Sequence, residues 1–384
     1  MKIIFISLDK INDLDEPGIY HDLLGKFKDS DHEVYVVSPY ERRFNKRTNF
    51  KKIQNVFFLN VWTPNIQKCG LIEKFFSTIF IEFFFLKAIK KYAGNIKFDL
   101  ILYATPPVTI TNLIRYLKND SNGFTYLLLK DIFPQNAVDL GMIKKKSIIY
   151  KYFRNKEKKL YSLSDKIGCT SEASVEYILK KNNEICKQKI EVNPNSADIK
   201  KINIGHSFKL KNISLPSDKI LFIYGGNLGK PQGIKYLISN IENCKDLEKA
   251  FFVIVGSGTE YDYIKNIIKI KKLTNMILIN HLPKYDFECL LNKSNVGLVC
   301  LDPNFTIPNF PSRMIPYMKY KLPILFAVDI VTDCGQIAVD NNFGLKCING
   351  DKKTFKSNVK LLISDKSLIT KMGNNSYNII MKNF

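Results

Sequence analysis

Three loops in the second half of the chain carry residue types that can bind a nucleotide diphosphate. They are YGGNLGKPQG at 224–233, VGSGTE at 255–260 and FTIPNFPSR at 305–313, and each joins a strand-like apolar run to a helix-like segment. A parallel sheet gathers such loops at one edge, where backbone N–H groups and helix N-termini suit phosphate. The leading hypothesis is therefore an enzyme that uses a nucleotide.

The first loop combines glycines with a lysine. Gly225, Gly226 and Gly229 allow a tight turn. The helix expected at 232–241 would direct its positive end at the loop and favour a bound phosphate by about 0.3 to 1 kcal/mol. Lys230 adds a full positive charge. The alternative for this loop, taken alone, is a turn that only packs strand against helix.

The other two loops supply further candidates. Gly256 and Gly258 let the chain turn sharply at the sheet edge, near the sugar or base of a ligand, although a third glycine of the dinucleotide-binding fingerprint is missing. In the third loop, Ser312 and Arg313 open a helix expected at 312–320, and the guanidinium can clamp phosphate with two hydrogen bonds. A structural pair between Arg313 and a carboxylate is the alternative.

In the first half, Asp131 follows a strand-like run that ends at Leu129. This position predicts a carboxylate at the carboxyl end of a strand, where it can accept or orient the proton of an acceptor hydroxyl. The alternative is an aspartate that caps a turn or a helix.

Alternating strand-like and helix-like segments must position these residues. Strands are expected in the first half at 3–7, 33–38, 56–61, 99–103, 125–129, 166–169 and 189–192. The alternation restarts with strands expected at 220–224, 251–255, 276–279, 296–300 and 324–327. This predicts two doubly wound, Rossmann-like α/β domains with a cleft between them. The expected limits are 1–200, 201–365, and 366–384 for a C-terminal helix that packs back on the first domain.

The composition fits two globular domains in a reducing compartment. A chain of 384 residues is longer than a domain with a single hydrophobic core usually is. Its apolar fraction of 45% argues against extended disorder. The 8 cysteines are scattered without a CxxC pair, which is typical of a reduced compartment and argues against disulfides and a zinc site. The start, MKIIFISLDK, lacks the apolar core and cleavage site of a signal peptide, so we expect a cytoplasmic protein.

The net charge of +22 favours an anionic partner. Basic residues cluster at 90–97 and 144–159, although an AT-rich genome that enriches lysine explains part of the charge. The Phe-rich segment 71–92 is interrupted by Glu82, and its apolar run is too short to span a bilayer. It predicts either a helix buried on the sheet or an interfacial helix on anionic lipid. In the second case the lipid would meet Lys74, Lys87, Lys90 and Lys91.

Seven stretches spread over most of the chain carry a resemblance to a known family. They are EPGIYHDLL, DHEVYVVSPYERR, FDLILYATPP, LLLKDIFPQNAVDLGMI, FRNKEKKLYSLSDKIGCTS, YGGNLGKPQGI and FTIPNFPSRMIPYM. The chain resembles GT-B glycosyltransferases of family 4, and among them the bacterial fucosamine transferases of O-antigen, capsule and colanic acid synthesis. The resemblance implies a retaining transfer from a nucleotide sugar, an acceptor site in the first domain, a donor site in the second, and no obligatory metal.

The resemblance also implies roles for individual residues. Charge on the departing β-phosphate would be stabilised by Gly226, Asn227, Lys230 and Arg313. The remaining donor contacts would come from Leu228, Gly256, Gly258, His281, Leu282, Pro283, Pro311 and Ser312. Asp131 would complete the catalytic set with Lys230 and Arg313. Glu16 and Gly18 would bind the acceptor.

Some positions depart from the family pattern. Many members carry a Glu-x7-Glu pair where this chain has Pro308 and Pro316, and a lysine where it has Gln232. Either Lys230 and Arg313 compensate for these losses, or the enzyme is weak or inactive.

The sequence thus predicts a cytoplasmic glycosyltransferase that is peripheral on the inner face of the plasma membrane. It would move an N-acetylated amino sugar from a UDP-sugar to a polyprenyl-diphosphate-linked saccharide in bacterial surface polysaccharide synthesis, without a cofactor. The alternatives are a GT-B enzyme resembling UDP-HexNAc 2-epimerases and a non-enzymatic nucleic-acid binder. We disfavour nucleic acid as a partner because the aromatic residues lie in apolar runs, not between Lys and Arg residues.

Overall fold

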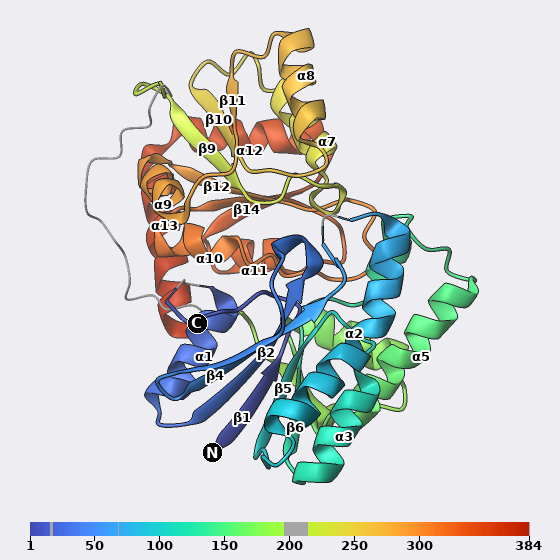
Figure 1. Cartoon of the computed structure of the whole chain (residues 1–384). Coiled ribbons are helices and arrows are strands. Elements are labelled where there is room, and N and C mark those ends of the chain that lie inside the picture. The colour runs from blue at the N-terminus through green and yellow to red at the C-terminus, as the bar shows by residue number, and fades with distance from the viewer. Residues whose placement is uncertain (16–17, 68, 196–213, 384) are drawn as a thin grey trace. The chain divides into compact units, whose positions relative to one another are not determined.

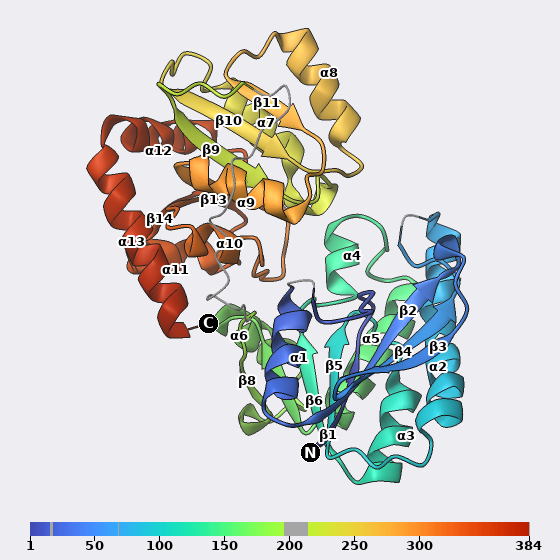
Figure 2. The same cartoon turned by 60° about the vertical axis from the view of Figure 1, so that its left-hand side comes forward.

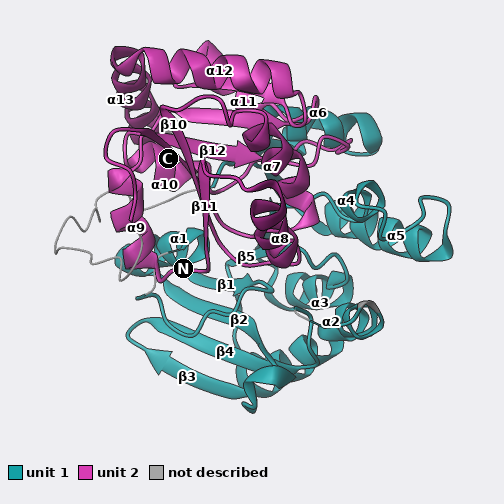
Figure 3. Ribbon diagram, turned by 90° about the horizontal axis from the view of Figure 1, so that it is seen from above, with its two compact units in different colours: residues 1–198 teal, residues 199–384 magenta. Residues whose placement is uncertain are grey.

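The fold is taken from a computed structural model, which describes residues 1–15, 18–67, 69–195 and 214–383. The chain forms two compact units, residues 1–198 and 199–384, which Figure 3 shows in different colours. Each unit is an α/β domain built around its own sheet. The predicted pair of Rossmann-like domains is confirmed. The cleft between the two domains stays a prediction, and so do the domain boundaries at residues 200 and 365.

In the described residues, the first sheet has eight strands in the order β3-β4-β2-β1-β5-β6-β7-β8. Their bounds are β1 Lys2–Ile6, β2 Glu33–Glu41, β3 Asn49–Ile53, β4 Val56–Thr63, β5 Leu100–Thr105, β6 Phe124–Leu129, β7 Lys166–Cys169 and β8 Ile190–Val192. Neighbouring strands are parallel, except that β3 pairs antiparallel with β4. The sequence did not predict β3, because this solvated edge strand (NFKKI) lacks the apolar run of a central strand.

Helices cover both faces of the first sheet (Figures 1 and 2). One face carries α1 (Ile19–Asp29), whose buried Leu24 joins a core with Phe5, Val36 and Leu102. The other face carries α2 (Leu71–Ala93), α3 (Thr111–Ser121) and α5 (Ile148–Leu163). The remaining helices of this unit are η1 (Arg42–Phe44), α4 (Gln135–Asp139), α6 (Glu172–Lys181) and η2 (Lys187–Lys189).

Within the part of the chain that the structure describes, the second sheet has six parallel strands in the order β11-β10-β9-β12-β13-β14. The bounds are β9 Ile220–Gly225, β10 Ala250–Val255, β11 Met276–Ile279, β12 Val296–Cys300, β13 Ile324–Val328 and β14 Gly344–Ile348, of which only β14 was not predicted. One face packs on α7 (Ile234–Glu242), α8 (Tyr261–Lys271) and α12 (Lys352–Ser364). The strands also contact α9 (Lys284–Lys293), α10 (Met314–Lys319) and α11 (Cys334–Asp340).

The C-terminal helix α13 (Lys366–Asn383) belongs to the second unit and packs there against α10 and α12. Its predicted return to the first domain stays a prediction.

Two predicted helix starts are wrong. The helix expected from residue 232 begins at Ile234, because Gly233 takes a left-handed conformation (φ 57°) after the short turn η3 (Lys230–Gln232). The helix expected from residue 312 begins at Met314, whose N–H bonds back to the Pro311 carbonyl in a turn. With only 6 residues, α10 is too short for a helix dipole to carry the anion-binding argument.

Candidate functional site

The first two glycine-rich loops lie against each other at the carboxyl ends of β9 and β10. The Glu260 N–H donates to the Leu228 carbonyl at 2.8 Å. A Cβ atom on Gly256 would lie 1.8 Å from the Gly226 oxygen, and one on Gly258 would lie 2.4 Å from the Leu228 oxygen. The close approach of the two loops therefore explains Gly256 and Gly258 without a ligand.

Arg313 lies beside the first loop. Its guanidinium carbon is 4.7 Å from the centre of the Tyr224 ring and 3.6 Å from the place where a Cβ atom of Gly226 would be. Among the described residues, its Nη1 atom is buried without a hydrogen-bond partner, and no carboxylate forms an ion pair with it. The structural ion pair between Arg313 and a carboxylate, which was the alternative, is therefore not found in the described part of the chain. A poorly solvated cation without a counter-ion is costly, and an anion bound beside Gly226 would offset that cost.

Aromatic side chains hold this corner of the site. The Gly225 N–H donates to the Tyr317 hydroxyl at 2.9 Å, and the Tyr224 hydroxyl donates to the Asn227 carbonyl at 2.7 Å. A Cβ atom on Gly225 would lie 2.1 Å from the Phe287 ring of α9. Burial raises the pKa of Tyr317 to about 12, so this phenol stays neutral at physiological pH. The sequence analysis missed these aromatic residues, although a tyrosine in an otherwise apolar run is a signal of a buried hydroxyl that needs a partner.

Of the other residues predicted in the first loop, Leu228 is fully buried, and the rest are accessible. Gly226, Asn227 and Lys230 are exposed, and Lys230 lies on the turn η3. The Asn227 amide donates to the Gln232 side chain at 3.0 Å, within the loop itself. Gln232, at the position where the family often has lysine, therefore shapes the loop.

The predicted base-contacting residues lie on the loop between β11 and α9. His281 is exposed, Leu282 is half-buried, and Pro283 directly precedes α9. Because Phe287 of α9 packs on Gly225, this loop and the first glycine-rich loop lie on neighbouring parts of the sheet edge. In the third loop Pro311 is half-buried and Ser312 is exposed, while Pro308 is buried.

A second cluster lies in the first unit at the carboxyl ends of β1 and β6. Burial, followed by the nearby Asp9 carboxylate, raises the pKa of Asp131 to about 6. Burial also raises the pKa of Asp9, against the opposing effect of His21. The alternative of a helix cap is not seen, because Pro134 occupies the N-cap position of α4 and no side chain caps it. A carboxylate with this pKa can exchange a proton near neutral pH.

Lys130 and Tyr20 extend this cluster, and sequence reasoning missed both. Burial lowers the pKa of the Lys130 amine to about 8. The pKa of Tyr20 is raised by burial and by the charges of Asp9 and Asp131. Gly18 caps α1 with extended backbone, and a Cβ atom there would lie 2.8 Å from Nδ1 of His21. Glu16, the other predicted acceptor residue, lies outside the described residues.

Helix α2 has a buried face and an apolar exposed face. Ile81, Phe85 and Ile89 are buried, which fits the prediction of a helix packed on the sheet. Its opposite side carries an exposed stripe, defined by Ile72, Phe76, Phe80 and Phe83, whose exposed fractions are 52% or more. Within the described chain, none of the helices has the length and apolar character needed to cross a membrane.

Comparisons with known proteins bear on both units. Residues 207–379 match the family described as "Glycosyl transferases group 1". The chain is 27% identical over 302 residues to "Probable glycosyltransferase WbjE" of Pseudomonas aeruginosa, which covers 75% of this chain and 71% of that protein. Sucrose-phosphate synthase from Thermosynechococcus elongatus has a similar fold, with a TM-score of 0.76 at 14% identity over 100% of this chain and 94% of the other. Anabaena HepE in complex with UDP gives a TM-score of 0.67 at 13% identity over 100% and 96%.

These similarities confirm two predictions, the GT-B fold class and the enzyme class of glycosyltransferase. The narrower assignments to family 4 and to the fucosamine subgroup stay predictions. The roles predicted for individual site residues also stay predictions, although the fold brings Gly226 and Arg313 together in one unit and Asp131 and Gly18 into the other.

Proposed function

We propose that the chain, a glycosyltransferase of group 1, moves an N-acetylated amino sugar from UDP to a polyprenyl-diphosphate-linked saccharide with retention of configuration. We assign it to family 4 and to the fucosamine subgroup of surface polysaccharide synthesis. The observation that carries the donor half of this proposal is the buried Nη1 of Arg313, which lacks a partner among the described residues and lies beside Gly226. The UDP complex of Anabaena HepE supports UDP as the leaving group.

In the proposed reaction, the bond between the sugar C1 and the β-phosphate oxygen breaks. A bond from the acceptor oxygen to C1 forms on the same face of the sugar. Arg313, Lys230 and the N–H groups around Gly226 and Asn227 would stabilise the charge that develops on the diphosphate. The acceptor proton would pass to the carboxylate of Asp131, whose pKa of about 6 suits a general base.

The remaining predicted contacts complete the donor and acceptor sites in this proposal. The exposed His281 loop would contact the uracil base, and Ser312 and Pro311 would line the phosphate side. Gly256 and Gly258 would act indirectly, since they let the first loop keep its shape. Gly18, and with it the neighbouring Glu16, would bind the acceptor. No metal or cofactor is part of the proposed reaction.

The exposed stripe of α2 supports the proposed attachment to an anionic membrane surface. The Phe75 ring packs edge-on against Phe153 at 5.8 Å, which joins α2 to α5, where Ile148 and Ile149 are also exposed. Exposed lysines lie on α2, on α5 and in the segment before α5, namely Lys74, Lys87, Lys90, Lys91, Lys144, Lys145, Lys146 and Lys151. Apolar insertion and attraction of about 1 kcal/mol per basic residue would then act together on one face. A protein held there would be peripheral on the inner face of the plasma membrane.

The donor half is tested with Arg313→Ala and Arg313→Lys, measured by titration calorimetry with UDP. Loss of a buried charge-assisted contact predicts at least 10-fold weaker binding for the alanine variant and partial recovery for lysine. Arg115→Ala, which removes an exposed arginine of α3, is the matched control and should bind UDP normally. Unchanged UDP affinity in a folded Arg313→Ala would overturn the assignment. Turnover of UDP-HexNAc without an acceptor would favour the epimerase alternative.

A further inference from the structure

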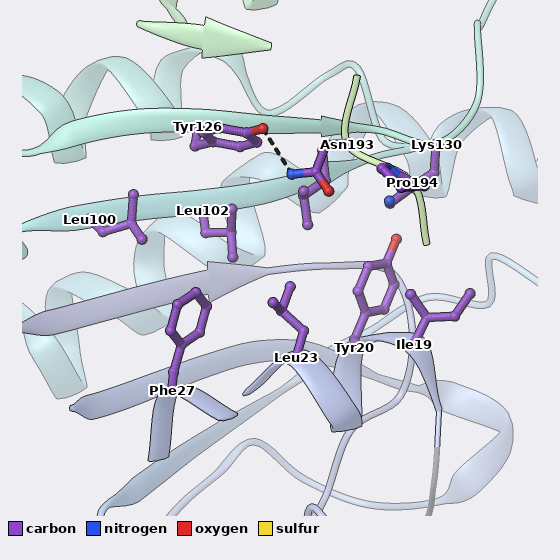
Figure 4. A pocket seen from close by; sticks show the side chains of 11 residues that line it. Ile19, Tyr20, Leu23, Phe27, Leu100, Leu102, Tyr126, Lys130, Asn193 and Pro194 are labelled. Carbon is purple, nitrogen blue, oxygen red and sulfur yellow. Dashed lines mark hydrogen bonds between the residues drawn. The ribbon is translucent and has the colours of Figure 1, made fainter. Parts of the chain in front are cut away.

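An apolar groove crosses the α1 face of the first sheet (Figure 4). Its cavity volume is about 150 Å³. It lies between α1, the strands β5 and β6, and the segment that follows β8. Its lining residues are Ile19, Tyr20, Leu23, Phe27, Leu100, Leu102, Tyr126, Leu128, Lys130, Asn193 and Pro194. A cavity of this size in an apolar protein interior holds a ring of about six carbon atoms.

The groove runs along the strands and has two different ends. Because α1 runs antiparallel to β1, Ile19 lies toward the carboxyl edge of the sheet and Phe27 toward the amino edge, about 12 Å away at 1.5 Å per residue. Leu100, the first residue of β5, lies at the amino end, and Lys130 follows the last residue of β6 at the carboxyl end. Among the described residues that line the groove, Lys130 is the only charged one, and it lies at the edge that carries Asp131.

Two polar side chains in the wall of the groove, Tyr126 and Asn193, are paired with each other. The Tyr126 hydroxyl accepts from the Asn193 amide at 2.8 Å and donates to Glu191 at 2.8 Å, as Figure 4 shows for the first of these bonds. A Cβ atom on Gly168 would lie 2.5 Å from the same hydroxyl, so the absence of a side chain there lets the Tyr126 ring lie across β7. Apart from the Tyr20 hydroxyl and the Lys130 amine, the groove therefore offers mainly hydrocarbon and aromatic surface to a ligand.

Lys130 differs from these wall residues. In the described part of the chain, its amine has neither a hydrogen-bond partner nor an ion pair. A half-buried ammonium at the mouth of an apolar groove is complementary to an anionic group attached to a hydrocarbon chain. A free sugar fits less well, because its several hydroxyl groups need more donors and acceptors than Tyr20 and Lys130 supply.

We propose that this groove binds the isoprenoid chain next to the diphosphate of the lipid-linked acceptor, with the diphosphate at Lys130. The inference rests on the proposed function and names a site for the lipid part of its acceptor. Lys130 and Asp131 are consecutive, so a phosphate at the amine would bring the attached sugar toward the carboxylate that receives its proton. Burial of the isoprenoid in the groove would increase the binding affinity of the acceptor about fourfold for each buried methylene.

The test measures binding of geranyl diphosphate and of inorganic diphosphate to the full chain, by calorimetry in saturating UDP so that the donor site is blocked. Geranyl diphosphate should bind at least 10-fold more tightly than inorganic diphosphate. Leu100→Trp, which fills the amino end of the groove, should remove this difference without weakening inorganic diphosphate. Lys130→Met should weaken both ligands together.

A second filling variant and a control make the result decisive. Leu23→Trp narrows the groove from the side of α1 and takes the place of Leu100→Trp if that variant does not fold. The control is Leu361→Trp, which adds a ring at an exposed site on α12, away from the groove. Equal affinities for the two ligands would overturn the proposed lipid site. So would tighter binding of geranyl diphosphate than of inorganic diphosphate in both filling variants. If UDP bound to none of the proteins while geranyl diphosphate still bound more tightly than inorganic diphosphate, the result would count against the proposed donor site and not against the lipid site.

Discussion

Replacing Asp131 with asparagine is expected to stabilise the first unit and to abolish sugar transfer. Burial and the Asp9 charge raise the pKa of Asp131 from 3.8 to about 6 in the folded chain. At 1.36 kcal/mol per pKa unit, the ionised carboxylate costs the fold about 3 kcal/mol at pH 7. Because the residue is half-buried and keeps some solvent, we expect about half of this value, or about 1 to 2 kcal/mol, for Asp131→Asn.

The sign follows from the direction of the shift. An acid whose folded pKa is raised binds its proton more tightly in the native state, so native stability falls as the pH rises from 3.8 to about 6. The advantage of asparagine should therefore be large at pH 7 and mostly gone at pH 4. No hydrogen bond to the Asp131 carboxylate exists among the described residues, so the amide replacement breaks none.

Trp62, the only tryptophan, makes this measurement specific to the first unit. Urea unfolding followed by its fluorescence reports the free energy of unfolding of that unit at each pH. Asp165→Asn is the matched control with the opposite sign. Although burial raises the pKa of Asp165, bonds from Lys118 at 2.6 Å and from the Thr125 N–H at 2.9 Å lower it overall, so its loss should destabilise the unit. Destabilisation by Asp131→Asn at pH 7, or an equal gain at pH 4, would refute the reasoning.

Three further predictions concern the loops, the exposed stripe and pH. Gly256→Ala should destabilise the second unit by about 2 to 4 kcal/mol in urea unfolding followed by circular dichroism, since its Cβ atom would lie 1.8 Å from a backbone oxygen. Replacing Phe76, Phe80 and Phe83 with serine should lower retention on anionic liposomes at least 10-fold with little change in melting temperature; normal retention would refute membrane contact through α2. The transfer rate should rise with pH through about 6 as Asp131 ionises, and a flat profile would exclude it as the base.

Most strands could be predicted from apolar runs, because buried parallel strands need them. The predictions failed at β3 and β14, where one or both faces are solvated and the apolar run is short or interrupted by lysine. Helix starts failed where glycine and proline turns intervene, since the sequence does not show that Gly233 takes a left-handed conformation. Local pattern therefore predicts the sheet well and its connections less well.

The candidate sites divide in the same way. Arg313 could be found because its loop has an unusual composition, whereas Asp9, Tyr20 and Lys130 could not. Their roles depend on β1 lying next to β5 and β5 next to β6, which brings Asp9 to Asp131 across more than a hundred residues of sequence. Side chains that the strand order brings together are far apart in the sequence, so no local motif predicts that they act together.

Charges in poor solvent give the strongest argument for function in both units. In the described residues Arg313 has no carboxylate partner, and Lys130 has neither a hydrogen bond nor an ion pair, while burial and the Asp9 charge together raise the pKa of Asp131. Each arrangement lowers the stability of the free protein, and packing alone would favour neutral side chains at these positions. An anion at Arg313, a phosphate at Lys130 and a hydroxyl proton at Asp131 would each remove one of these costs. Ligands should therefore raise the melting temperature of this chain more than contact area alone predicts, and neutral substitutions at the same positions should raise it without ligand.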